Sequence, residues 1–181
     1  SKIPGSPVAY WVSEAVLQCY RNKIIYDYAN PCKGIDTGNN NVFLRLWYEV
    51  PSSMRYTPTG KPCMDADFKK YKWFPYNKGG DYRKWYGNNE YVLNWAEDGN
   101  VLRNFKGSNL RNKNKYFEKG ITWSTVTSGN SSFRYFSYGF LFDNGGSCLF
   151  AKTYLLYIQR KCCEGIADNT THNQHATRNY W

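Results

Sequence analysis

The chain has 181 residues, of which 41% are hydrophobic and 19% aromatic, and this composition excludes an intrinsically disordered chain. No apolar run approaches the length of about 18 residues that a transmembrane helix needs, so no membrane-spanning role is expected. Lysine and arginine number 24 against 14 acidic residues, and the net charge of +10 favours a polyanionic partner, nucleic acid before an anionic membrane. The first residues hold neither Met nor an apolar signal core, which indicates a piece of a longer protein.

The first predicted elements are short. Residues 4–7 are typical of an extended segment. A helix is expected from Ser13, with Ser13 as its N-cap and Val16, Leu17 and Tyr20 on one face. A short strand follows and ends at residues 30–34.

Residues 36–41 are predicted to form a pronounced turn, because Asn, Asp and Gly tolerate left-handed backbone. Alternating side chains over residues 42–50 predict a strand, and residues 51–62 form a Pro-, Ser- and Thr-rich loop. A helix from an Asp98 N-cap to Phe105 is expected to turn Val101, Leu102 and Phe105 inward.

Further strands are predicted over residues 71–74, 91–95, 121–127, 133–136, 139–143 and 147–150. A turn at Gly79-Gly80 separates the first two, and residues 106–119 form a basic, Asn-rich loop. The expected fold class is α+β, with one twisted, mainly antiparallel or mixed β-sheet and short helices.

The six cysteines do not form a disulfide or zinc pattern. Four are isolated, Cys162 and Cys163 are adjacent, and there is no C-x-x-C pair, so reduced thiols in a cytoplasmic protein are expected. The two histidines, His172 and His175, follow Cys162-Cys163 at a spacing that matches no familiar zinc site, so no metal is expected.

Catalytic motifs are absent from the sequence. No histidine precedes His172, so a Ser-His-Asp or Cys-His arrangement has no base in the expected core. There is also no G-x-G and no P-loop to hold a nucleotide phosphate. These observations favour a binding module with no catalytic residues of its own.

Half of the basic residues lie in two windows, residues 69–85 and 103–119, which hold 12 of the 24 lysines and arginines against only Asp81 and Glu118. Six aromatic residues are interleaved in the first window. Clustered charge of this kind suits a groove that follows phosphates, and the aromatic rings suit stacking on bases. The alternative is a solvated face on which lysine stems cover core aromatics.

The Asn-rich turn also allows two interpretations. An Asn amide carries a donor beside an acceptor, which is the pair that reads adenine in the major groove. Asn and Gly are equally the ordinary residues of tight turns, and this interpretation is favoured from the residues alone.

Several long motifs occur in a family-specific order. They are Ile3-Pro4-Gly5-Ser6-Pro7-Val8-Ala9-Tyr10-Trp11-Val12-Ser13, Thr37-Gly38-Asn39-Asn40, Phe43-Leu44-Arg45-Leu46-Trp47-Tyr48-Glu49-Val50, Lys72-Trp73-Phe74-Pro75-Tyr76-Asn77-Lys78-Gly79-Gly80, Arg83-Lys84-Trp85-Tyr86-Gly87-Asn88-Asn89, Gly120-Ile121-Thr122-Trp123-Ser124 and Gly139-Phe140-Leu141-Phe142-Asp143. Over residues 3–158 the chain resembles the target-recognition region of PglX-type adenine-specific DNA methyltransferases, the methylating component of bacterial BREX phage-exclusion systems.

The resemblance implies a parent enzyme that transfers a methyl group from S-adenosylmethionine to N6 of adenine in double-stranded DNA, after turning that base out of the duplex. The catalytic domain, with its Asn/Asp-Pro-Pro-aromatic motif, would lie N-terminal to Ser1, and other BREX components are further possible partners. Neither a catalytic residue nor a cofactor site is expected in this chain. The implied location is the bacterial cytoplasm.

Residues 1–158 are thus expected to form a DNA target-recognition domain, while residues 159–181 depart from the family. A shifted reading frame and a divergent end both remain open for this polar tail. The rival interpretation is a secreted carbohydrate-binding module with exposed aromatic rings, and the sequons at Asn130 and Asn169 would fit it.

Within the recognition domain, Arg45, Arg83 and Arg134 are candidates for guanine contacts, Asn39 and Asn40 for adenine, and Lys78 and Lys84 for phosphate. The full set of predicted DNA contacts is Thr37, Gly38, Asn39, Asn40, Arg45, Lys72, Trp73, Asn77, Lys78, Arg83, Lys84, Trp85, Asn88, Asn89 and Arg134.

Overall fold

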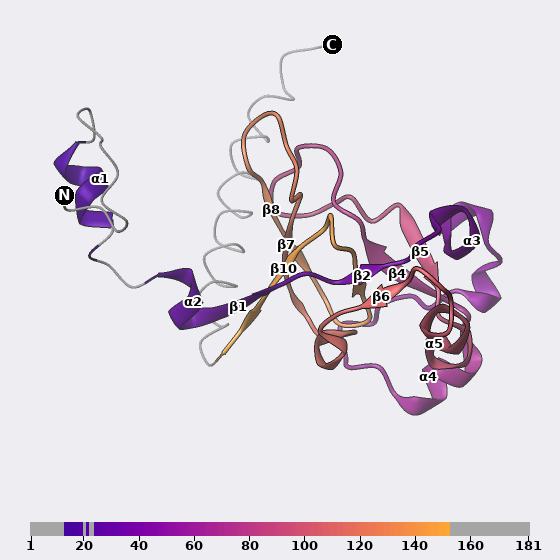
Figure 1. Cartoon of the computed structure of the whole chain (residues 1–181). Helices are drawn as coiled ribbons and strands as arrows, with labels where there is room; N and C mark the ends of the chain where they lie inside the picture. The colour runs from indigo at the N-terminus through magenta and orange to yellow at the C-terminus, as the bar shows by residue number, and fades with distance from the viewer. Residues whose placement is uncertain (1–12, 20, 22–23, 153–181) are drawn as a thin grey trace, which may run out of the picture.

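The strands are divided between two four-stranded sheets and a two-stranded ribbon in the computed structural model, which describes residues 13–19, 21 and 24–152 (Figure 1). One sheet, here the terminal sheet, has the order β1-β10-β7-β8 and antiparallel pairing throughout. Its strands are β1 (Ala29–Cys32), β10 (Cys148–Ala151), β7 (Gly120–Trp123) and β8 (Phe133–Phe136).

The other sheet, here the central sheet, has the order β3-β5-β4-β9, with β4 and β9 parallel and the other pairs antiparallel. Its strands are β3 (Leu44–Leu46), β5 (Tyr91–Asn94), β4 (Trp73–Asn77) and β9 (Leu141–Phe142), and the ribbon joins β2 (Ile35–Asp36) to β6 (Asn109–Leu110). The predicted α+β class with antiparallel and mixed pairing is confirmed, and its strands are shared among several sheets.

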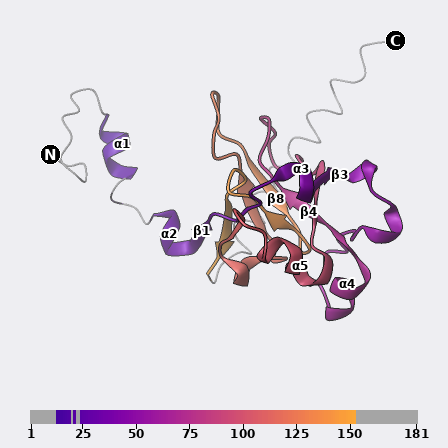
Figure 2. The ribbon, with the colours of Figure 1, turned by 45° about the vertical axis from the view of Figure 1, so that its right-hand side comes forward.

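The helices are short connections between these strands. They are α1 (Glu14–Cys19), α2 (Ile25–Tyr28), α3 (Asn40–Phe43), α4 (Asp65–Lys70) and α5 (Ala96–Arg103), with 3-10 turns η1 (Trp47–Glu49), η2 (Ser52–Met54) and η3 (Lys113–Lys115). Figures 1 and 2 show α1 and α2 to one side of the sheets and α3, α4 and α5 at the other end. Within the described residues, none of these helices is long and apolar enough to cross a membrane.

The core is built from aromatic rings on the inner face of the central sheet. Phe74 is fully buried, stacks on Tyr56 with ring centroids 5.2 Å apart, and meets Phe117 edge-on at the same distance. In the register of the sheet Phe74 lies opposite Leu93, which lies opposite Leu44. Opposite residues share a face, so this row marks the inner side of the sheet.

The neighbouring row belongs to the outer face, because side chains alternate along a strand. Arg45 in β3 lies opposite Val92 in β5, and Val92 lies opposite Pro75 in β4. Val92 and Pro75 are buried, whereas Arg45 is exposed at the edge strand. The outer face of the central sheet thus carries an exposed arginine beside two buried apolar residues.

The strand predicted over residues 42–50 is wrong in its extent, since only Leu44–Leu46 is a strand. Asn39 caps the one-turn helix α3 before it, with Asn39 Oδ1 accepting a hydrogen bond from the Asn41 N–H at 3.1 Å. After it, the Glu49 carboxylate accepts from the Leu46 N–H at 2.7 Å and holds η1. Local side-chain bonds to the backbone thus interrupt the alternating pattern at both ends.

The helix predicted over residues 98–105 also differs. Glu97, Asp98 and Gly99 have φ of 53°, 54° and 73°, so the start of α5 is left-handed. Asp98 does not cap the helix: its carboxylate accepts hydrogen bonds from Trp95 Nε1 at 3.1 Å and from Arg103 at 2.6 Å. The hydrogen bond between Asp98 and Trp95 therefore holds the start of this helix in place.

The inward face predicted for this helix is correct for Leu102, which is buried, and wrong for Val101, which is 56% exposed. Phe105 packs edge-on against Phe43 at 5.1 Å. The helix predicted from Ser13 is present as α1, and strands appear near each of the other predicted positions. The expectations for residues 4–7, for Tyr20 and for the tail lie outside the described residues.

Candidate nucleic-acid interface

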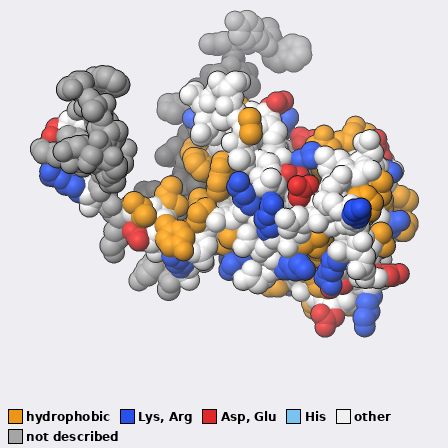
Figure 3. Space-filling view, viewed as in Figure 1, with side chains coloured by type: hydrophobic (Ala, Val, Ile, Leu, Met, Phe, Trp, Pro, Cys, Tyr) orange, Lys and Arg blue, Asp and Glu red, His pale blue; other side chains and the backbone are white. Residues whose placement is uncertain are grey.

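The second basic window, residues 103–119, lies along the inner side of the central sheet. Its Phe117 packs on Phe74, and its Tyr116 is buried. Two of its lysines lie over aromatic rings, Lys115 5.8 Å from the Phe150 centroid and Lys119 5.3 Å from the Tyr138 centroid. Figure 3, which looks onto β6 and α5, shows basic side chains mixed with hydrophobic and acidic ones. This window fits the alternative of charged residues covering core aromatics.

The basic residues of the first window lie in different parts of the structure. Lys69 and Lys70 lie on α4, whose Phe68 packs against Phe74 on the inner side. Lys72 Nζ lies 5.5 Å from the Trp73 ring, and Lys78 Nζ lies 3.5 Å from the Asp143 carboxylate. Lys72 and Lys78 are thus partly engaged by neighbouring side chains.

Arg83 and Lys84 are exposed, as are Lys69 and Lys70 on α4. The Arg83 side chain is 57% exposed and lies 3.9 Å from the Glu90 carboxylate, a distance at which an exposed pair contributes little. Lys84 is exposed, with Nζ 5.8 Å from the Tyr82 ring. Both are placed to meet a polyanion.

The segment of residues 85–89 follows directly and is held to the edge of β8. The Trp85 N–H donates to the Phe133 carbonyl at 2.9 Å, and the Tyr135 N–H donates to the Trp85 carbonyl at 2.8 Å. Trp85 and Asn88 have φ of 74° and 59°, and the buried Asn88 amide donates to the Asp81 carbonyl at 2.9 Å. Positive φ in residues other than glycine is costly and persists where surrounding contacts enforce it.

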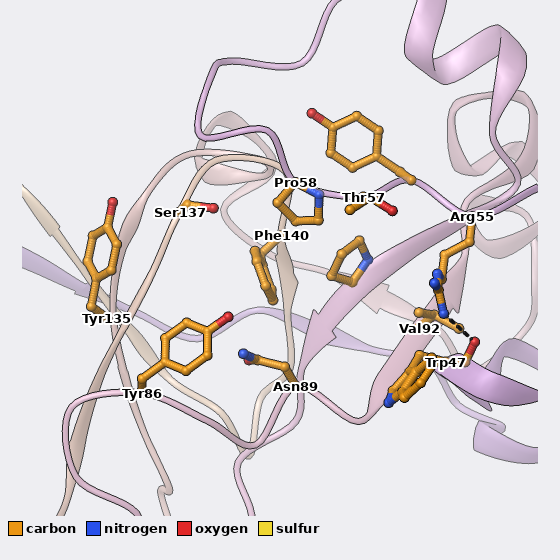
Figure 4. A pocket seen from close by; sticks show the side chains of 12 residues that line it. Trp47, Arg55, Thr57, Pro58, Tyr86, Asn89, Val92, Tyr135, Ser137 and Phe140 are labelled. Atoms are coloured by element: carbon orange, nitrogen blue, oxygen red, sulfur yellow. Dashed lines mark hydrogen bonds between the residues drawn. The ribbon is translucent and has the colours of Figure 1, made fainter. Parts of the chain in front are cut away.

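A pocket of about 390 Å³, here the aromatic pocket, lies between this segment and the outer face of the central sheet (Figure 4). Val92 and Pro75 line it from the central sheet, and Tyr135 lines it from β8 of the terminal sheet. It is lined by Trp47, Arg55, Tyr56, Thr57, Pro58, Pro75, Tyr86, Asn89, Val92, Tyr135, Ser137 and Phe140. The volume is at the small end of the range for ligand sites.

Two arginines lie near the aromatic pocket. Arg55 lines it, with its guanidinium carbon 5.0 Å from the Trp47 ring centroid and a 2.6 Å hydrogen bond to the Trp47 carbonyl, drawn as the dashed line in Figure 4. Arg45 shares the outer face with Val92 and donates to the Asn41 and Leu44 carbonyls, each at 2.6 Å. The predicted base-reading residue Arg45 is thus brought to the pocket side of the sheet.

The turn at residues 37–41 consists of local hydrogen bonds. The buried Thr37 hydroxyl lies 2.7 Å from Asn40 Oδ1 and donates to it, and Asn39 Oδ1 accepts from the Asn41 N–H. The left-handed residue is Gly38, with φ of 68°, whereas Asn39 is extended with φ of −154°. The amide oxygens that would read adenine already accept bonds from the turn itself.

Several predicted contacts lie in the interior. Arg134 is 1% exposed and donates to Ser132 at 3.0 Å and to Ser124 at 3.3 Å, and burial lowers the pKa of its guanidinium. Asn77 and Trp73 are 2% and 8% exposed. These three side chains are therefore not accessible at the surface in this conformation.

No sequence pattern indicates the residues that complete the aromatic pocket. Arg55, Thr57 and Pro58 come from the predicted loop of residues 51–62, and Tyr135 comes from the predicted strand of residues 133–136. Only the tertiary fold brings them to Tyr86 and Asn89. Trp47 is 46% exposed in the structure, and a large ring in water is often part of a binding surface.

The thiols of Cys32, Cys63 and Cys148 are free. Burial raises the pKa of all three thiols, which makes them poor nucleophiles. Among residues 13–19, 21 and 24–152, no group of three or more His, Cys, Asp or Glu side chains is arranged to hold a metal ion.

Comparison with known proteins identifies a class of proteins that contain a region similar to this chain. No family model matches the chain. Over 83% of its length, however, it is similar to part of two adenine-specific methyltransferases. The chain is homologous to a region of PglX-type adenine-specific methyltransferases, as its motifs indicate.

The two relatives are BrxX of Escherichia coli O9:H4 (strain HS), 45% identical over 152 residues, and PglX of Lacticaseibacillus casei (strain Zhang), 40% identical over 159 residues. The chain spans only 12% and 13% of the length of these relatives. It thus corresponds to one segment of much larger proteins.

Proposed function

We propose that this chain is the sequence-specific DNA-recognition segment of an N6-adenine methyltransferase that acts in bacterial phage defence. The observation that carries the proposal is the similarity of 83% of the chain to adenine-specific methyltransferases. An exposed basic and aromatic surface around the aromatic pocket supports it, since such surfaces suit phosphate contact and base stacking.

Different residues of this surface have different tasks. Lys84 and Arg83 contact phosphates and orient the duplex, and such contacts carry no sequence information. Arg45 and Asn89 read bases, because a guanidinium matches two acceptors of guanine and an amide matches a donor and an acceptor of adenine. The turn at residues 37–41 supports Arg45 through the Asn41 carbonyl and does not itself read DNA.

The methyl donor, S-adenosylmethionine, is assigned to the rest of the parent enzyme. Within residues 24–152 the nearest approach to the Asn/Asp-Pro-Pro-aromatic motif is Asn30-Pro31-Cys32, which lies in β1. Asn30 and Pro31 pair there with Phe150 and Leu149 of β10, inside the terminal sheet. Residues fixed in a sheet ladder do not present an amide to a flipped base, so they do not fit the catalytic role.

Binding of the purified chain to duplex DNA at several salt concentrations tests the proposal. Affinity should fall steeply with salt, and Lys84→Ala should lower the log-log slope by about 0.9, the value for one phosphate contact. Lys78→Ala should change it less, because Asp143 already neutralises Lys78. Lys115→Ala, on the inner side of the central sheet, is the matched control and should leave the slope unchanged.

Affinity that ignores salt would contradict the proposal, as would equal effects of Lys84→Ala and Lys115→Ala. In the complete parent enzyme, Arg45→Ala should cost about 1–3 kcal/mol at a cognate base contact. Methylome sequencing measures this as lost or altered site preference. Methyl transfer by the isolated chain would show that the catalytic assignment is wrong.

A further inference from the structure

We infer that the aromatic pocket binds a nucleobase that has left the stack of bound DNA, with adenine as the preferred base. The inference rests on the proposed DNA-recognition function and adds a site for a single base. It is based on the rings of the pocket, the amide of Asn89 and the backbone that carries both.

The rings of the pocket are suited to a flat aromatic ligand. Tyr86 and Trp47 line it and yet remain 64% and 46% exposed, so large π-faces are available at its mouth. Figure 4 shows Tyr86 and Tyr135 on one side and Trp47 on the other, with Phe140 between them. Stacking on such rings is sequence-tolerant and is the usual way in which proteins hold unstacked bases.

Asn89 supplies the polar contact that such a site needs. Its side chain lines the pocket near Tyr86 in Figure 4, and within the described residues no side chain or backbone group is hydrogen-bonded to its amide. The amide of the neighbouring Asn88, in contrast, donates a hydrogen bond to the Asp81 carbonyl. An uncommitted donor–acceptor pair beside stacking rings favours adenine.

The backbone between Trp85 and Asn88 presents these two side chains in a fixed orientation. Trp85, Gly87 and Asn88 all have positive φ, and hydrogen bonds from Trp85 to β8 anchor the segment. A strained backbone that neighbouring contacts enforce is a common property of binding sites. Here its consequence is that Tyr86 projects outward while Asn89 faces the pocket.

Charge distinguishes a nucleobase from the other ligand that suits aromatic grooves, a proline-rich peptide. Arg55 lies over the Trp47 ring at the pocket, Arg45 shares the outer face, and Arg83 lies against Gly87. The Arg55 cation at the pocket favours a ligand that is attached to phosphates, and so does the net charge of +10 of the whole chain. A neutral peptide gains nothing from this charge.

The experiment uses the 181-residue chain and three duplexes of equal length: fully paired, with one unpaired adenine, and with an abasic site at the same unpaired position. An unpaired base has already lost its pairing, so it costs less to capture. The unpaired adenine should raise affinity over the abasic duplex, which has the same phosphates. Tyr86→Ala should reduce this gain by about five- to a hundredfold, up to its complete loss.

Three variants distinguish a base site from a general loss of structure. Asn89→Ala should reduce the gain, while Tyr86→Phe should keep it because the ring remains. Tyr82→Ala is the matched control, since Tyr82 is 52% exposed four residues before Tyr86 but does not line the pocket. All variants should bind the abasic duplex as the unchanged chain does.

Equal affinity for the adenine and abasic duplexes, with salt-dependent binding intact, would overturn the base site and leave the proposed DNA function standing. Absence of binding to all three duplexes would contradict the proposed function itself. Decaproline is the probe for the peptide alternative. Tyr86-dependent binding of decaproline, without an adenine gain, would assign the pocket to a peptide.

Discussion

The turn at residues 37–41 and the segment at residues 85–89 look alike in sequence but differ in the use of their asparagines. Both contain a Gly that is followed directly by adjacent Asn residues, and both were predicted to contact DNA. In the turn, the Asn39 and Asn40 oxygens accept bonds from Asn41 and Thr37. In the segment, Asn88 is buried and bonded, whereas the Asn89 amide lies in the aromatic pocket.

Under the proposed function, a Gly-Asn-Asn pattern takes part in recognition only where the fold supplies further partners. Trp47, Tyr135 and Phe140 lie around Asn89 and come from three other parts of the chain. The turn lies instead against the backbone of Gly107, which Gly38 approaches closely. We therefore expect substitutions in the turn to change stability and substitutions of Asn89 to change binding.

Gly38→Ala should give the largest effect and tests the structural role of the turn. Gly38 has φ of 68°, and a Cβ there would lie 2.6 Å from the Gly107 carbonyl carbon. A strained backbone and a clash with another backbone together should lower the free energy of unfolding by about 3 kcal/mol or more. Urea denaturation measures this, and a change below about 1 kcal/mol would show that the two loops are not packed together.

Asn88→Ala should have the next largest effect, because Asn88 is the structural member of its pair. It loses a buried bond to Asp81 and retains a φ of 59° that Ala disfavours, at a combined cost of about 2 kcal/mol. Asn88→Gly keeps the backbone conformation and should lose only the bond. Equal stability losses in the two variants would show that the left-handed conformation costs nothing.

The sequence predicted a large part of the fold because strands such as β8 depend on local alternation of side chains. It failed at β3, where Asn39 and Glu49 bond to the backbone and end the strand early. It failed again at the buried Arg134, since an arginine in a strand gives no sign of burial. The aromatic pocket was beyond prediction, because Arg55, Tyr86 and Tyr135 meet only through the pairing of distant segments.

Thr37→Val should have a smaller effect on stability. Thr37 is 3% exposed, and its hydroxyl donates to the exposed Asn40 side chain. Valine keeps the shape and leaves Asn40 free to bond to water, so the free energy of unfolding should fall by about 1 kcal/mol. A duplex-affinity loss larger than the stability loss would mean that the turn contacts DNA after all.

Asn39→Gly should have the smallest effect, and it tests the turn interpretation most directly. At an N-cap, Gly is only a few tenths of a kcal/mol worse than Asn, because it fits the same backbone conformation. Asn39 is such a cap, so stability should barely change. In the complete parent enzyme the set of methylated sites should also stay the same, since the Asn39 oxygen is engaged with Asn41 and does not read a base. Asn89→Ala, measured in parallel by methylome sequencing, should alter that set. If Asn39→Gly changed the methylated sites and Asn89→Ala did not, the recognition role would move from the pocket to the turn.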